Sequence, residues 1–112
     1  MREKIKILVM DTDIDSLTRL YIGLAQFGFN VEVSDRVEDA QQRLHRFKPD
    51  IILAEQTFLD SIVKNSIKQR AKIVYLVNQH RELPLPGDFV SKPFKVSGVA
   101  EKLKKLFRKR HK

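Results

Sequence analysis

The sequence contains no cysteine and no tryptophan, and only four glycines and four prolines among its 112 residues. Without cysteine there is no disulfide framework, no thiolate nucleophile and no zinc–thiolate site, which fits a reducing, cytoplasmic location. A run of roughly 18 apolar residues, the minimum for a membrane-spanning helix, is also missing. Neither a Gly/Ser-rich linker nor an internal repeat divides the chain, so its length predicts a single domain.

Acidic residues are absent from one end of the chain. The whole sequence has 22 Lys and Arg against 14 Asp and Glu, a formal net charge of +8. Within residues 102–112, which we call the basic C-terminal segment, seven bases occur with no acid: Lys102, Lys104, Lys105, Arg108, Lys109, Arg110 and Lys112. The preceding residues are therefore almost neutral. The segment predicts either a solvated helix end, favoured by the helix dipole, or a contact with nucleic acid, an anionic surface or an acidic partner.

Short apolar runs alternate with amphipathic stretches along the chain. The apolar runs predict five strands, at 5–10, 29–33, 51–54, 73–77 and 89–91. Helical spacing predicts helices over 17–24, 37–47 and 96–107, with a weaker one near 58–67. Such alternation indicates βαβ units with right-handed crossovers, hence an α/β fold with helices on both faces of a parallel sheet.

The first predicted helix has one apolar stripe, formed by Leu17, Leu20, Tyr21 and Leu24. Asp13 is its expected N-cap. In parallel sheets the chemistry gathers at the carboxyl ends of the strands. The candidate site residues are therefore those that end or follow the strands: Asp11, Thr12, Asp13, Glu55, Val77, Asn78 and Lys92.

Three blocks carry a family resemblance: KILVMDTD at 6–13, KPDIILAE at 48–55 and DFVSKPF at 88–94. With these blocks in this order, nearly the whole chain resembles the response-regulator receiver domain of two-component (phosphorelay) signalling. The resemblance implies a flavodoxin-like, doubly wound, five-stranded parallel sheet in the order 2-1-3-4-5. It also implies a signalling domain, not an enzyme, that contacts a protein partner or an output domain.

In that family an aspartate after the third strand accepts the phosphoryl group, and acids after the first strand help to hold Mg²⁺. A Ser or Thr after the fourth strand and a Lys after the fifth bind the phosphoryl oxygens. The resemblance assigns the phosphoacceptor position to Glu55, the acidic cluster to Asp11, Thr12 and Asp13, the switch positions to Val77 and Phe89, and the pocket lysine to Lys92.

Three of these positions depart from the family pattern. Glu55 carries its carboxylate one methylene further out than aspartate, Thr12 lacks a charge, and Val77 cannot donate a hydrogen bond. We therefore predict a degenerate receiver, or pseudo-receiver, that has no cofactor and acts through protein–protein contacts. We expect Glu55 to pair with Lys92, and if Mg²⁺ binds at all, Asp11 and Glu55 are its expected ligands. An active but atypical phospho-receiver is the lesser alternative.

The chain between the last two strands is short. Residues 78–88 include two prolines, which predicts that the family's fourth helix is reduced or missing. Leu83 and Leu85 either cover the exposed strip or, with Phe89, form an interaction surface for a partner or a second copy of this chain. That surface would lie over the fourth strand, the fifth strand and the last helix. We expect residues 1–101 to form the receiver-like domain and 102–112 the basic end of its last helix.

Overall fold

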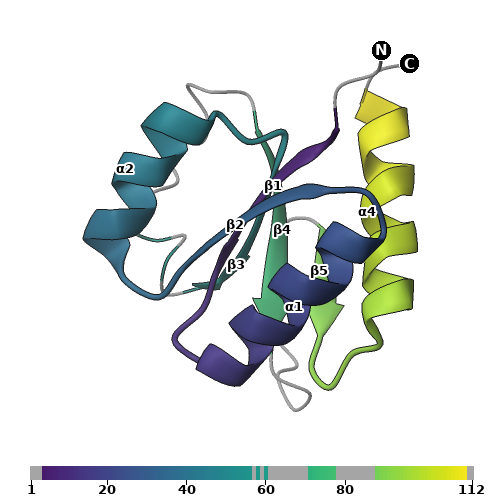
Figure 1. The fold of residues 1–112 in the computed structure, drawn as a ribbon, viewed down its shortest axis with the longest axis horizontal. Helices are drawn as coiled ribbons and strands as arrows, with labels where there is room; N and C mark the ends of the chain where they lie inside the picture. The colour runs from purple at the N-terminus through teal and green to yellow at the C-terminus, as the bar shows by residue number, and fades with distance from the viewer. Residues whose placement is uncertain (1–3, 57, 59, 61–70, 78–87, 111–112) are drawn as a thin grey trace.

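A computed structural model of the chain describes residues 4–56, 58, 60, 71–77 and 88–110. One parallel sheet has the strand order β2-β1-β3-β4-β5 (Figure 1). The elements in chain order are β1 (Lys6–Met10), α1 (Ile14–Gln26), β2 (Asn30–Ser34), α2 (Val37–Phe47), β3 (Ile51–Glu55), β4 (Lys72–Val77), β5 (Asp88–Ser91) and α4 (Val96–Arg110). The parallel sheet and its predicted strand order are confirmed.

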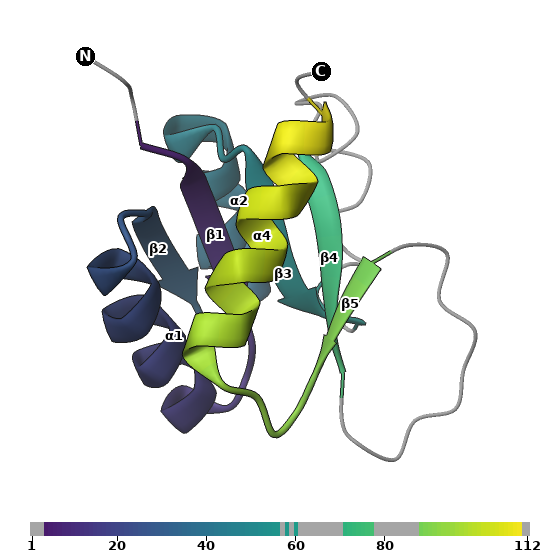
Figure 2. The same cartoon turned by 90° about the vertical axis from the view of Figure 1, so that its right-hand side faces the viewer.

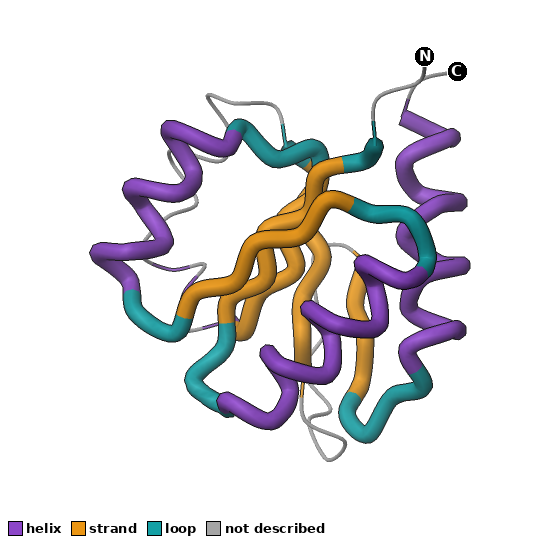
Figure 3. Tube along the Cα trace, in the orientation of Figure 1, coloured by secondary structure: helices purple, strands orange, loops and turns teal. Residues whose placement is uncertain are grey.

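Helices cover both faces of the sheet. Figure 3 shows α2 on one side and α1 and α4 on the other. In β1, Ile7 and Val9 belong to the core under α1 and α4, whereas Leu8 and Met10 belong to the core under α2. Successive side chains of a strand point to opposite faces, so a strand covered on both sides must be apolar at every position.

Helix α1 begins as predicted and differs in its apolar stripe. The Asp13 carboxylate accepts hydrogen bonds from the Asp15 N–H at 3.1 Å and the Ser16 hydroxyl at 2.8 Å, which confirms Asp13 as the N-cap. The leucines of the stripe are buried, but Tyr21 is 49% exposed, so its predicted place in the core is wrong. The reason is geometric: only the side of α1 that faces the sheet and α4 is covered, and it holds Leu17, Leu20 and Leu24.

Helix α4 packs beside α1 (Figure 2). A Cβ atom on Gly23 would collide with the Val96 side chain, so the absence of a side chain at position 23 permits this approach. Leu103 of α4 is fully buried in the core. The basic C-terminal segment therefore begins inside a helix that the core requires, and the charges described along it project from that helix.

Several residues with a predicted role lie outside the part of the chain that the structure describes. Asn78, Leu83, Leu85 and the predicted loss of the fourth helix fall within 78–87, and Lys112 lies beyond the last described residue. For Lys109 and Arg110 the structure describes the backbone only. Among the described helices, none combines the length and the apolar character that crossing a membrane requires.

Candidate functional site at the carboxyl ends of the strands

The parallel register brings the predicted site positions to one edge of the sheet. Asp11 directly follows β1, Glu55 ends β3, Val77 ends β4 and Lys92 directly follows β5. The Lys92 N–H donates a hydrogen bond to the Val77 carbonyl oxygen at 2.8 Å, which extends the β4–β5 ladder by one residue. The Lys92-Pro93 peptide bond that follows is cis.

The Asp11 side chain is fully buried, with 0% exposure. Its Oδ1 atom accepts a hydrogen bond from the Asp13 N–H at 3.0 Å, and its own N–H donates to the Ser34 carbonyl oxygen at 3.2 Å. Its Oδ2 atom lies 2.6 Å from the Lys92 Nζ atom, which is its partner among the described residues. A buried carboxylate needs such a counter-charge, because an isolated ion in the protein interior is very costly.

The Lys92 ammonium is also mostly buried, with 18% side-chain exposure, and has a second acidic neighbour. The Asp13 Oδ2 atom lies 3.8 Å from it, near the limit for an ion pair. The described structure thus gives Lys92 two partners from the end of β1. Glu55 is half-buried at the end of β3, and its expected pairing with Lys92 stays a prediction.

Asp13 is held in its charged form. The hydrogen bond from the Ser16 hydroxyl is the main cause that lowers the pKa of Asp13 below the ordinary value of 3.8, assisted by the Asp15 N–H and the nearby Lys92 charge. Partial desolvation works in the opposite direction and is outweighed. Asp13 therefore caps α1 as an anion at neutral pH. The positive end of the helix dipole stabilises this negative charge.

The residues at this edge do not fit a divalent-cation site. Mg²⁺ requires near-octahedral oxygen ligands, usually including carboxylates that are free to coordinate it. Here one Asp11 oxygen faces an ammonium and the other accepts an amide hydrogen bond, while Asp13 is engaged in capping. Thr12 adds no charge. Among the residues that the structure describes, no three acidic or histidine side chains gather as a metal-ligand set.

The two switch positions lie in contrasting environments. Val77 is buried, with 7% exposure, and offers no polar atom to the pocket. Phe89 on β5 is 45% exposed, and the Lys102 Nζ atom lies 5.1 Å from the centroid of its ring. A cation over an aromatic face is attracted to the ring quadrupole, so this contact favours the outward position of Phe89.

Three of the described bases of the C-terminal segment have different neighbours. Lys102 lies over Phe89, Lys104 lies 5.6 Å from the ring of Phe29, and Lys105 pairs with Glu101 at 3.4 Å. These bases are close together in the sequence, but the helical rotation between neighbouring positions directs their side chains to different surroundings. No signal in the sequence predicts the surface hollow lined by Phe89, Lys95 and Gly98.

Sequence comparison alone assigns no family. No protein-family model matches the chain, and no curated protein matches it.

Solved structures do resemble it, and they share one fold. NtrX from Brucella abortus has a TM-score of 0.82 at 17% identity, over 96% of this chain and 27% of that one. A response regulator from Thermotoga maritima has a TM-score of 0.77 at 19% identity, over 95% and 99% of the two chains. The chemotaxis response regulator CheY4 of Vibrio cholerae has a TM-score of 0.77 at 17% identity, over 92% and 98%.

These likenesses establish the fold that the resemblance implied. The chain has the flavodoxin-like fold found in receiver domains of response regulators. It covers nearly all of the solved Thermotoga maritima and Vibrio cholerae chains but about a quarter of the NtrX chain.

Proposed function

We propose that this chain is a receiver-like signalling domain of the two-component type that acts in the cytoplasm through protein–protein contacts and without phosphorylation. The single observation that carries this proposal is the ion pair between the fully buried Asp11 carboxylate and the Lys92 ammonium. The pair neutralises within the chain the two charged groups with which a receiver would bind a metal ion and a phosphoryl group.

Two further positions support the same proposal. Val77, at the position where the family has a Ser or Thr that binds the phosphoryl group, is buried, and its methyl groups donate no hydrogen bond. The extra methylene of Glu55 also displaces the nucleophile, and a displacement of about 1 Å can lower a rate by about a hundredfold. The domain therefore lacks both the geometry for phosphoryl transfer and a group with which to read it.

Incubation with acetyl phosphate and Mg²⁺, followed by intact-mass spectrometry, tests this proposal. We expect the mass of the chain to stay unchanged, because neither the acceptor nor the metal site fits. The matched positive control is the triple variant Thr12→Asp/Glu55→Asp/Val77→Thr, which restores the family's residue types on the same fold. We expect this variant to gain one phosphoryl group, because the carboxylate added at position 12 supplies a metal ligand outside the Asp11–Lys92 pair.

A phosphoryl adduct on the native chain would overturn the proposal and favour an active, atypical receiver. Peptide mapping would then locate it. An adduct on Glu55 and an adduct elsewhere on the surface are distinguished by repeating the reaction with Glu55→Gln, which abolishes only the first.

The partner in this proposal is a protein, either an output domain in a longer chain or a separate protein. NtrX supports the first arrangement by analogy, because its receiver-like part lies within a chain several times longer. The fold has no catalytic group of its own in this proposal, so the surface that contacts the partner carries the function.

Nucleic-acid binding through the basic C-terminal segment remains a testable alternative. Removing the segment is unsuitable as a test, because it would delete the buried side chain of Leu103. The variant Lys104→Gln/Lys105→Gln/Arg108→Gln neutralises exposed bases and keeps the helix. Phosphate contacts would give DNA retention that falls steeply with salt and is lost in this variant.

A further inference from the structure

The strand β2 lies at one edge of the sheet, and among the described strands only β1 pairs with it (Figure 2). The Asn30 N–H donates to the Ile5 carbonyl oxygen at 2.9 Å, so the backbone groups of Asn30 and of every second residue after it point toward β1. In an extended strand the intervening residues point the other way. The N–H and C=O groups of Val31 and Val33 therefore face the outer edge of the sheet.

This edge lacks the features that usually keep sheet edges from pairing. Such edges are commonly blocked by proline, by lysine side chains or by a bulge. The strand Asn30–Ser34 contains neither proline nor lysine, and it pairs with β1 residue for residue. Its one charged residue, Glu32, accepts a hydrogen bond from Arg43 of α2 at 3.0 Å. The chain thus presents a short, regular strand edge.

A surface hollow lies beside this edge, lined by residues of α1, β2 and α2, and we call it the β2 edge surface. Its apolar lining includes Ile14, Tyr21 and Ile22 of α1 and Val33 of β2. The three α1 side chains are 58%, 49% and 53% exposed, and they are three of the five large hydrophobic side chains exposed in the described part of the chain. A concentration of exposed apolar side chains of this kind marks an interaction surface.

The charged lining of the β2 edge surface is balanced. It consists of two acids, Asp35 and Asp39, and two bases, Arg36 and Arg43. Arg43 pairs with Asp39 at 2.8 Å, whereas Arg36 and Asp35 lie 3.9 Å apart with side chains that are 76% and 49% exposed. The second pair therefore keeps both of its charges accessible. A surface that carries both signs side by side can be complementary to itself, as a two-fold interface requires.

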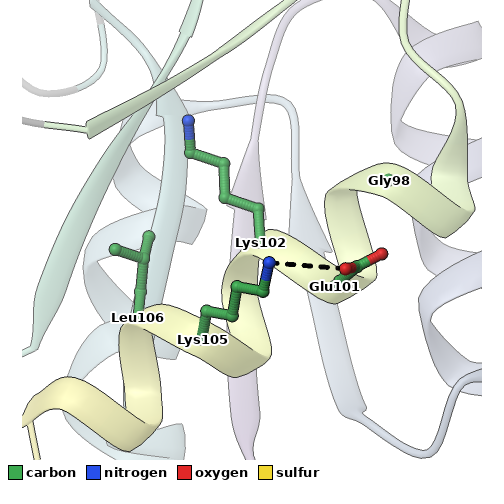
Figure 4. A pocket seen from close by; sticks show the side chains of 5 residues that line it. All are labelled: Gly98, Glu101, Lys102, Lys105 and Leu106. Atoms are coloured by element: carbon green, nitrogen blue, oxygen red, sulfur yellow. Dashed lines mark ion pairs between the residues drawn. The ribbon is translucent and has the colours of Figure 1, made fainter.

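The surface around α4, near which the sequence favours a second copy, has a different balance. Lys102 and Lys105 line a hollow there with one acid, Glu101, which pairs with Lys105 at 3.4 Å (Figure 4). A two-fold contact on that face would bring lysines against lysines, and like charges across an interface are costly. Of these two described surfaces, the β2 edge surface fits a second copy better.

We infer that the chain forms a two-fold symmetric dimer through the β2 edge surface. The strand β2 pairs with its copy in the antiparallel direction, so that one sheet continues through both copies. The two-fold axis is then perpendicular to the sheet, and both α1 helices meet on the same face, where Tyr21 and Ile22 become buried. Arg36 of each copy meets Asp35 of the other. This inference goes beyond the proposed function, because it holds whether or not the strand-end pocket accepts a phosphoryl group.

Sedimentation velocity of the full chain over a concentration series tests the inference, and we expect a monomer–dimer equilibrium. Tyr21→Glu places a charge in the contact twice, once from each copy, and should raise the dissociation constant by at least about tenfold. Phe27→Glu makes a similar change at an exposed aromatic residue that does not line the hollow, and should alter it by less than about twofold. Circular dichroism verifies that both variants are folded.

A pair of charge variants identifies the partner as a second copy. Asp35→Arg makes this part of the surface basic, and Arg36→Asp makes it acidic, so each variant alone should dimerise at least about threefold more weakly than the native chain. A one-to-one mixture of the two variants should regain association, because a basic copy then meets an acidic one. A contact with a different protein would give no such recovery.

Cross-linking through a single introduced thiol locates the contact, because the native chain has no cysteine. Thr18 is exposed and lines the hollow, and cysteine is close to threonine in size. A short bifunctional maleimide should join two copies of Thr18→Cys. It should leave Gly98→Cys, whose thiol lies on α4 outside the β2 edge surface, without a cross-link.

Three outcomes would overturn the inference: a native chain that stays monomeric up to about 1 mM, equal weakening by Tyr21→Glu and Phe27→Glu, or no recovery in the mixture of charge variants. Cross-linking of Gly98→Cys without cross-linking of Thr18→Cys would assign dimerisation to α4 and would also overturn it. The acetyl phosphate experiment reports on the strand-end pocket alone, so the two proposals fail separately.

Discussion

The pocket at the strand ends and the β2 edge surface differ in how their charges are satisfied. In the pocket, Asp11 is fully buried, Lys92 is mostly buried, and the Asp11 Oδ2 and Lys92 Nζ atoms lie 2.6 Å apart. At the β2 edge surface, Asp35 and Arg36 are exposed and lie 3.9 Å apart. The first site is complete within the chain, whereas the second presents charges of both signs and apolar surface to the outside.

This difference indicates which of the two regions can bind a ligand more easily. A satisfied buried ion pair resists change, since an incoming ligand must first replace the partner and bear the desolvation of both ions. Exposed charges keep most of their hydration and can exchange it for charges of opposite sign, and exposed apolar side chains are stabilised by burial. Under the proposed function, the pocket is therefore a structural feature and the partner contacts another surface.

The largest expected effect comes from breaking the pocket pair. Lys92→Met leaves the Asp11 carboxylate buried without a counter-charge, so we expect the free energy of unfolding to fall by about 3 kcal/mol. Urea denaturation measures it. In the double variant Asp11→Asn/Lys92→Met no uncompensated charge remains, and most of the stability should return. A loss below about 0.5 kcal/mol for the single variant lies in the range of a solvent-exposed ion pair. Such a small loss would contradict the burial of the Asp11–Lys92 pair.

A smaller effect of opposite sign is expected on α4, outside both regions. Gly98→Ala should raise the free energy of unfolding by about 0.8 kcal/mol, because alanine loses less conformational entropy in a helix and meets no atom here. The same variant should leave dimerisation unchanged, because Gly98 does not line the β2 edge surface. Thermal denaturation and sedimentation on one preparation measure both quantities. A stabilised variant with weaker dimerisation would place α4 in the contact between copies.

The smallest expected effect is on the stability of the fold at acidic pH. The pKa of Asp13 is lowered chiefly by the Ser16 hydroxyl, and the pKa of Asp39 chiefly by the Arg43 guanidinium, which lies 2.8 Å from it. Because the folded pKa values lie below 3.8, these carboxylates stabilise the fold above about pH 4. Their contributions are lost as the pH falls through the folded pKa values, where the folded state also binds the proton.

Urea midpoints measured from pH 5 to pH 2.5 test this dependence. Asp13→Asn and Asp39→Asn should each reduce the acid-induced loss of stability, by no more than about 0.5 kcal/mol for the partly exposed Asp39–Arg43 pair. The α4 variant Lys102→Gln is the control and should leave the slope unchanged. Identical slopes in all three variants would contradict the assignment of the acid response to these two carboxylates.

Much of the fold could be predicted from the sequence, because its signals are local. Continuous apolar runs such as Ile51–Ala54 identify strands covered on both faces, and Asp13 before an amphipathic stretch identifies a capped helix. The prediction for Tyr21 was wrong because helical spacing gives a direction on the helix but not the width of the surface that covers it.

The candidate site was predictable in position but not in its contacts. The sequence itself determined that Asp11, Glu55, Val77 and Lys92 end or follow strands and so meet at one edge of a parallel sheet. Only the tertiary structure decided that Lys92 pairs with Asp11, that the basic C-terminal segment begins in a helix needed by the core, and that exposed apolar side chains of α1 line a hollow beside β2. The physical reason is that strand and helix signals act between neighbours in the chain, whereas the partner of a buried charge and the shape of a surface hollow depend on distances between residues far apart in it.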